Sequence, residues 1–120
     1  MKINDKLLVD SGWLDAQLTN DFSLYSETSI CKYRKNGKTA MIVGQVKVKK
    51  QMNEGVIFVL PEGFRPAYSM WFIQQGSGLS RWLLMISPNG NVYAQRYGST
   101  SQVDFQPSYW LPISATFLID

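Results

Sequence analysis

Residues 30–49 read ICKYRKNGKTAMIVGQVKVK, in which two runs of strand-forming residues flank an Asn-Gly pair. Asn36-Gly37 accepts the positive φ angles that a tight hairpin turn requires, so we predict two antiparallel strands, residues 30–35 and 39–49, joined at this pair. The second strand alternates between an apolar and a polar face, with Ile42, Val46 and Val48 on one and Gln45, Lys47 and Lys49 on the other. This alternation is typical of a sheet that packs on one side and meets water on the other.

Strand-like runs continue beyond this hairpin. Residues 56–60 are all apolar and predict a buried strand, which must end at Leu60-Pro61-Glu62-Gly63-Phe64-Arg65-Pro66 because proline cannot donate to a sheet ladder. Turn sequences at Gly76-Ser77-Gly78 and Pro88-Asn89-Gly90 then divide the chain into a three-strand meander. Its strands are residues 67–75, 79–87 and 91–97, and a last strand, whose partner the sequence does not identify, covers residues 113–119.

The fold class follows from this pattern. Apolar residues nowhere hold helical spacing for three turns, so we predict an all-β protein, an antiparallel β-sandwich of the jelly-roll type or a related one. The chain has 120 residues, which is the length of one domain and enough to hide roughly two-thirds of the surface that the unfolded chain exposes. We assign residues 13–120 to this domain and residues 1–12 to an N-terminal arm, which forms either a short helix or a docking segment.

The amino-acid composition excludes several kinds of active site. There is no histidine, which removes Ser-His and Cys-His nucleophile systems and almost every common zinc site. The one cysteine, Cys31, cannot form an intramolecular disulfide and is expected to pack as a small hydrophobic residue. Glycoside hydrolysis would need paired carboxylates, but the acidic residues fall mostly in predicted turns and strand ends. We therefore expect no enzymatic activity, no catalytic residue, no metal site and no cofactor.

The charge balance is mildly basic, with twelve lysines and arginines, nine acidic residues and a formal net charge of +3. Lysines beside aromatic residues on a small β domain could hold single-stranded nucleic acid by charge and stacking. The basic stretch is short and is followed by Glu54 and Glu62, so nucleic acid is the weakest of the partners that we consider. No apolar run approaches the ~20 residues of a membrane helix, and residues 1–9 lack the pattern of a signal peptide, so we expect neither membrane insertion nor export.

A long irregular stretch, residues 98–111, mixes polar side chains with aromatic ones and exceeds most hairpin connections in length. Such mixtures are typical of surfaces that bind sugars or proteins, because aromatic rings supply contact area and amides or hydroxyls supply direction. In the alternative interpretation, Phe105 and Trp110 close one end of the sandwich. The candidate ligand-binding residues in and beside this stretch are Arg96, Tyr97, Asp104, Gln106, Tyr109 and Trp110.

Several short motifs follow one another in a distinctive order. Tyr33-Arg34-Lys35-Asn36-Gly37-Lys38 leads into a strand that ends near Gly44-Gln45-Val46-Lys47, and the later motifs are residues 60–66 and Pro88-Asn89-Gly90-Asn91-Val92. This layout resembles the C-terminal β-sandwich domains of tail-fibre, baseplate and receptor-binding proteins of siphophages that infect Gram-positive bacteria. The resemblance runs from about residue 11 to residue 119, which is most of the chain.

The resemblance implies a stand-alone, non-enzymatic bacteriophage protein that acts by binding. Its partner would be a saccharide of the host cell wall or another phage tail protein. The protein would be located in the virion tail or, as a soluble phage protein, in the host cytoplasm. Two alternatives stay open, a purely structural phage protein and, more weakly, a protein that binds single-stranded nucleic acid. The sequence is compatible with both a monomer and a trimer.

Overall fold

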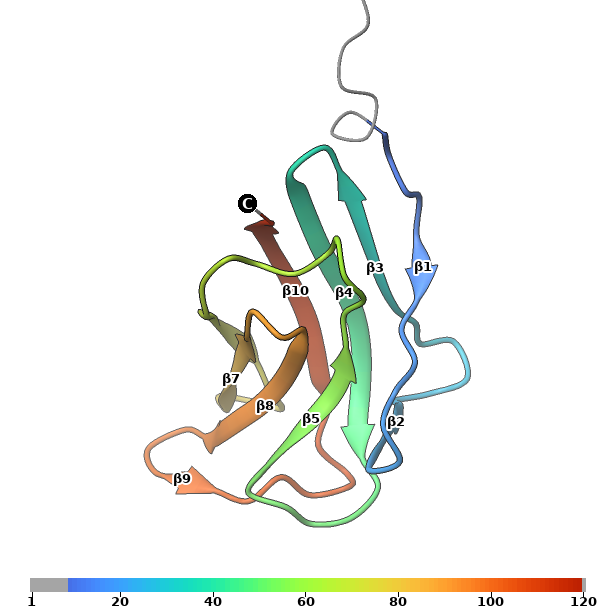
Figure 1. Ribbon diagram of the computed structural model, residues 1–120. Helices are drawn as coiled ribbons and strands as arrows, with labels where there is room; N and C mark the ends of the chain where they lie inside the picture. Colours follow the sequence, from blue (N-terminus) through green and yellow to red (C-terminus); the bar gives the residue numbers. More distant parts are fainter. Residues whose placement is uncertain (1–8, 120) are drawn as a thin grey trace, which may run out of the picture.

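The computed structural model describes residues 9–119, which fold into two antiparallel sheets that enclose a common core (Figure 1). The first sheet has the strand order β1-β3-β4-β10, with β2 also paired to β4, and the second has the order β5-β8-β7-β6, with β9 also paired to β8. The strands are β1 (Leu14–Asp15), β2 (Phe22–Leu24), β3 (Cys31–Asn36), β4 (Thr39–Val48), β5 (Glu54–Val59), β6 (Met70–Gln75), β7 (Arg81–Ile86), β8 (Asn91–Gly98), β9 (Gln102–Val103) and β10 (Leu111–Leu118). The predicted antiparallel β-sandwich is confirmed, and residues 9–119 contain no helix.

The predicted N-terminal arm or helix, residues 1–12, lies outside the described residues except for its last four. Within these, Ser11 donates its backbone N–H to the carbonyl oxygen of Lys35 at 2.9 Å, and Asp10 forms a β-bridge with Asn36. The Asp10 carboxylate also accepts hydrogen bonds from the Arg34 guanidinium, which lowers the pKa of that carboxyl below its usual value. Residues 10 and 11 therefore lie extended beside β3.

The predicted hairpin is confirmed, but its turn is shifted by one residue. Asn36 is the last residue of β3 and pairs with Thr39, the first residue of β4. The loop is therefore Gly37-Lys38, in which Gly37 has a φ of +64°. A glycine with positive φ at the first loop position is the arrangement of a type II′ turn, which twists as the flanking strands do. The prediction placed the turn on Asn36-Gly37 because both of those residues tolerate positive φ.

This turn gives a first testable result. Gly37→Ala should lower the free energy of unfolding by about 1 kcal/mol, because the strain of alanine at a positive φ exceeds the stabilisation that comes from a less flexible unfolded chain. Asn36→Ala is the matched control and should change it by less than about 0.5 kcal/mol, because Asn36 is an exposed strand residue. Urea denaturation of both variants measures the difference. Equal losses in the two variants would contradict the placement of the turn.

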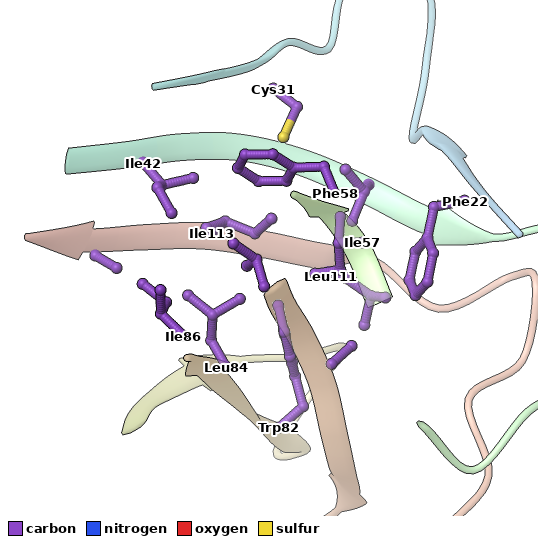
Figure 2. Close-up of a cluster of buried hydrophobic side chains, with 14 of the residues drawn as sticks. Phe22, Cys31, Ile42, Ile57, Phe58, Trp82, Leu84, Ile86, Leu111 and Ile113 are labelled. Atoms are coloured by element: carbon purple, nitrogen blue, oxygen red, sulfur yellow. The ribbon is translucent and has the colours of Figure 1, made fainter. Parts of the chain in front are cut away.

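The core lies between the sheets, where Ile42 on β4 and Ile113 on β10 face Leu84 and Ile86 on β7 (Figure 2). Strand β4 buries every second side chain, as the sequence predicts. Strand β5 departs from alternation because its pairing with β8 shifts at a β-bulge, so the neighbouring residues Ile57 and Phe58 are both buried. The last strand, β10, pairs with β4 along its whole length, which identifies the partner that the sequence left open.

Several motifs of the sequence meet at one corner of the sandwich. Leu60 donates its backbone N–H to the carbonyl oxygen of Gly90 at 2.8 Å, and its own carbonyl oxygen accepts the Nε–H of Arg65 at 2.8 Å. Lys35 Nζ donates to the carbonyl oxygen of Gly63 at 3.0 Å. Three of the motifs that carried the family resemblance therefore meet at this corner, where Lys35 on β3 of the first sheet contacts the segment that follows β5 of the second.

Candidate binding groove

Strand β8 carries a β-bulge near its C-terminal end. Arg81 pairs with Gly98 and Leu83 pairs with Gln95, so β8 has one residue more than β7 over this interval. Within the bulge Arg96 has a φ of +55°, the only positive φ at a non-glycine residue between residues 9 and 119. This left-handed backbone costs an L-residue about 1–2 kcal/mol. Bulges are found where a strand turns a side chain toward a new direction, often beside functional sites.

The bulge reverses the orientation of two side chains. Val92 and Ala94 point into the core, and strict alternation would send Arg96 inward and Tyr97 outward. Instead Arg96 is exposed, whereas Tyr97 is 2% exposed. The Tyr97 ring stacks on the ring of Tyr109, with centroids 4.5 Å apart. Tyr97, which the sequence analysis took as a surface aromatic, is thus part of the core and offers solvent no ring face.

Arg96 lies between two adjoining hollows near the C-terminal end of β8. The first has a volume of about 230 Å³ and is lined by Arg81, Arg96, Tyr97, Gly98, Ser99, Thr100, Ser101 and Gln102. The second has a volume of about 150 Å³ and is lined by Asn53, Glu54, Gln95, Arg96 and Gln102. Because Arg96 and Gln102 line both hollows, we describe the two together as the Arg96 groove.

The wall of the Arg96 groove is fixed by backbone pairing. Residues 99–101 connect β8 to β9, and β9 folds back so that Gln102 pairs with Gly98 and Val103 pairs with Tyr97. The pairing of β8 with β9 therefore holds both ends of this loop in place. Polar side chains on a loop held in this way are presented in fixed positions, which favours recognition of a ligand.

The two halves of the groove differ in charge. The residues that line the first hollow include two arginines and the hydroxyl residues Ser99, Thr100 and Ser101, but no acidic residue. In the second hollow Glu54 is present and accepts a hydrogen bond from Gln95 Nε2 at 3.4 Å, so the charge of Arg96 is offset there. Guanidinium groups bind phosphate and carboxylate through paired hydrogen bonds. The amides and hydroxyls can both donate to and accept from sugar hydroxyls.

The other sequence-predicted residues lie apart from the two hollows. Asp104 is half-buried and accepts a hydrogen bond from Gln51 Nε2 at 2.9 Å, and Gln106 is half-buried. Tyr109 is half-buried against Tyr97, and Trp110 is 38% exposed. Phe105 is fully buried, as expected for a residue that closes the end of the sandwich, whereas Trp110 is only partly covered. The six candidates therefore do not form one site.

Most residues of the Arg96 groove were not predicted. Arg81, Glu54, Gln95 and Gln102 lie on four different strands and Asn53 lies just before β5, and only the pairing of β5, β7 and β9 with β8 brings them together. The sequence contains one usable signal, the run Gly98-Ser99-Thr100-Ser101, which is small and polar as a ligand-binding loop requires. The bulge itself has no signature in the sequence.

Other chemistry is limited in the described part of the chain. Cys31 is buried at the start of β3, and burial raises the pKa of its thiol to about 12, so it is protonated at neutral pH. Between residues 9 and 119, no three histidine, cysteine or acidic side chains gather closely enough to hold a metal ion. The same residues include no helix of the length and hydropathy that a membrane span requires.

Comparison with solved structures gives the same architecture. The crystal structure of the head domain of phage bIL170, described in connection with a common fold for the receptor-binding domains of lactococcal phages, superposes with a TM-score of 0.57. The match covers 90% of this chain and 97% of that one, at 14% sequence identity. No protein-family model and no curated protein sequence matches the chain. The expected resemblance to phage receptor-binding domains is thus confirmed at the level of the fold.

Proposed function

We propose that this chain is a non-enzymatic binding module of a phage tail and that it recognises a saccharide of the host cell wall through the Arg96 groove. The observation that carries the proposal is the bulge, which keeps an exposed guanidinium on a backbone that favours glycine. Strain of this kind collects at functional sites because the fold must be built to hold it. The similarity in fold to the head domain of phage bIL170 supports a place on the virion tail.

The charges of the groove narrow the class of saccharide. The first hollow is lined by Arg81 and Arg96 and by no acidic residue, and this favours a negative group on the part of the ligand that lies there. The amides of the second hollow are suited to sugar hydroxyls. The proposed ligand is therefore a wall polysaccharide that carries phosphate or carboxylate groups. Asp104, Gln106, Tyr109 and Trp110 stay candidates for additional contacts outside the groove, and Trp110 is the most exposed of them.

Titration calorimetry with wall polysaccharides purified from a panel of Gram-positive bacteria tests this proposal. We expect saturable binding to an anionic polysaccharide, and the affinity should fall as ionic strength rises because salt screens exposed charges. Arg81→Ala should weaken this binding by about tenfold, the loss expected for one charge-assisted hydrogen-bonding group. Its melting temperature should be unchanged, because Arg81 is an exposed side chain at the start of β7.

Lys47→Ala is the matched control for this experiment. Lys47 is also a basic residue, but it lies on β4 in the first sheet and away from the groove, so its loss should leave binding unchanged. Equal affinities of Arg81→Ala and the unmodified protein would contradict the groove as the binding site. Absence of binding to every polysaccharide in the panel would favour the alternative, a purely structural phage protein.

A further inference from the structure

One row of side chains on the outer face of the second sheet is apolar across all four of its long strands. Trp71 on β6 pairs with Met85 on β7, Met85 pairs with Tyr93 on β8, and Tyr93 pairs with Val56 on β5. Side chains that are paired in this way lie in one row on the same side of the sheet. Trp71 is 58% exposed, so the row faces solvent. The outer face of the first sheet carries charged side chains instead, among them Lys32, Arg34 and Lys47.

The two aromatic side chains of this row have a defined spacing. One strand separates β6 from β8, and neighbouring strands lie about 4.8 Å apart, so Trp71 and Tyr93 stand about 10 Å apart across the sheet. The Tyr93 hydroxyl accepts a hydrogen bond from Asn91 Nδ2 at 2.9 Å, which fixes the direction of its ring. An extended β-linked glycan presents the same apolar ring face at every second sugar, with a repeat close to this spacing. Such faces stack on aromatic rings.

The next row of side chains leads from these rings to the Arg96 groove. Ile73 pairs with Leu83, Leu83 with Gln95, and Gln95 with Glu54. Gln95 and Glu54 also line the second hollow of the groove. The apolar face and the hydrogen-bonding groups therefore form one continuous surface. A purely apolar partner would leave the polar groups of this row uncovered, whereas a sugar chain offers both apolar ring faces and hydroxyls.

We propose that the second sheet carries a glycan platform, made by Trp71, Met85 and Tyr93, on which an extended β-linked sugar chain lies before it enters the Arg96 groove. This inference rests on the proposed function and adds the class of ligand to it, a linear chain of several sugars with flat ring faces. Trp71 and Tyr93 bind by stacking, and Gln95 and Glu54 orient the hydroxyls of the sugars that follow.

The test uses β-1,4-linked oligomers of N-acetylglucosamine and of glucose as probes, each as the dimer, tetramer and hexamer, in titration calorimetry with the full chain. For the unmodified protein we expect the affinity for one or both series to rise from dimer to hexamer. Trp71→Ala should weaken hexamer binding at least about fivefold, the loss of one stacking contact, and leave dimer binding unchanged. Trp13→Ala is the matched control, since Trp13 is 40% exposed beside β1 of the first sheet.

Three outcomes would overturn the platform. The first is that the unmodified protein binds neither hexamer, and the second is that Trp71→Ala and Trp13→Ala bind the hexamer equally well. The third is that Trp71→Ala changes the mass of the protein in analytical ultracentrifugation but leaves its glycan affinity unchanged. The last result would make this face a protein interface. The Arg96 groove is tested by a separate experiment, because the binding of Arg81→Ala to wall polysaccharide is measured with Trp71 unchanged. Loss of wall binding in Arg81→Ala, together with hexamer binding that does not depend on Trp71, would retain the groove and reject the platform.

Discussion

Arg96→Gly should weaken binding to the wall polysaccharide at least tenfold, about 1.4 kcal/mol or more, without any loss of folding stability. The reason lies in the backbone of the bulge. Arg96 has a φ of +55°, which glycine adopts without strain, so the substitution removes about 1–2 kcal/mol of local strain. The greater freedom of glycine in the unfolded chain offsets roughly 0.5–1 kcal/mol of that gain. The net free energy of unfolding should therefore be unchanged or higher by up to about 1.5 kcal/mol.

Arg96→Ala is the comparison that separates the side chain from the backbone. Alanine also lacks the guanidinium but keeps the backbone strain. The Arg96→Ala protein should therefore bind the polysaccharide as weakly as the Arg96→Gly protein, without any gain in folding stability. Titration calorimetry measures binding, and urea denaturation measures the free energy of unfolding. An Arg96→Gly protein that binds as tightly as the unmodified chain would contradict a role for the guanidinium. A loss of more than about 1 kcal/mol in stability would make Arg96 a residue of the scaffold.

Gly90→Ala should destabilise the domain by about 3 kcal/mol, because it combines backbone strain with a steric clash. Gly90 has a φ of +95°, and a Cβ there would lie 2.4 Å from the carbonyl oxygen of Leu60 and 2.6 Å from Arg65 Nε. Leu60 uses that oxygen to accept the hydrogen bond from Arg65 and donates its N–H to Gly90. The substitution therefore adds backbone strain and also breaks contacts at the corner where the sheets are joined.

Gly78→Ala is the matched control for this prediction. Gly78 has a φ of +61°, but a Cβ there would meet no atom within 4 Å, so only the conformational cost of about 1 kcal/mol applies. Thermal and urea denaturation of the two variants should differ by about 2 kcal/mol in the free energy of unfolding. Equal destabilisation of the two variants would show that the corner does not restrict the Gly90 position.

The parts of the fold that could be predicted from the sequence are those that depend on residues close together in the chain. Alternation along β4 and the turn residues of the meander depend on neighbouring residues only, so both could be predicted before the structure was known. The hairpin turn was misplaced by one residue because Asn36 and Gly37 tolerate the same backbone angles, and the choice between them is made by the pairing of Asn36 with Thr39. Strand order and the partner of β10 depend on contacts between distant residues.

The candidate site was harder to predict because a β-bulge decides it. Period-two alternation on β8 is correct as far as Gln95 and then reverses, which exposes Arg96 and buries Tyr97. Arg96 stays a candidate for ligand binding, whereas the reversal buries Tyr97, which the sequence analysis had selected as an aromatic residue beside the irregular stretch. Arg81 and Glu54 could not be connected with Arg96 from sequence, since 42 positions separate Glu54 from Arg96 (96 − 54) and only the sheet brings the two together.

The most direct test of the Arg96 groove is a map of backbone amide chemical shifts in a ¹⁵N-labelled protein titrated with the anionic wall polysaccharide. Binding in the groove should shift the amide signals of Arg81, Arg96 and residues 98–102 most strongly, and the shifts should saturate with the affinity measured by calorimetry. The groove is contradicted if those signals stay in place while the polysaccharide shifts signals elsewhere, such as those of Tyr109 and Trp110, or shifts none at all.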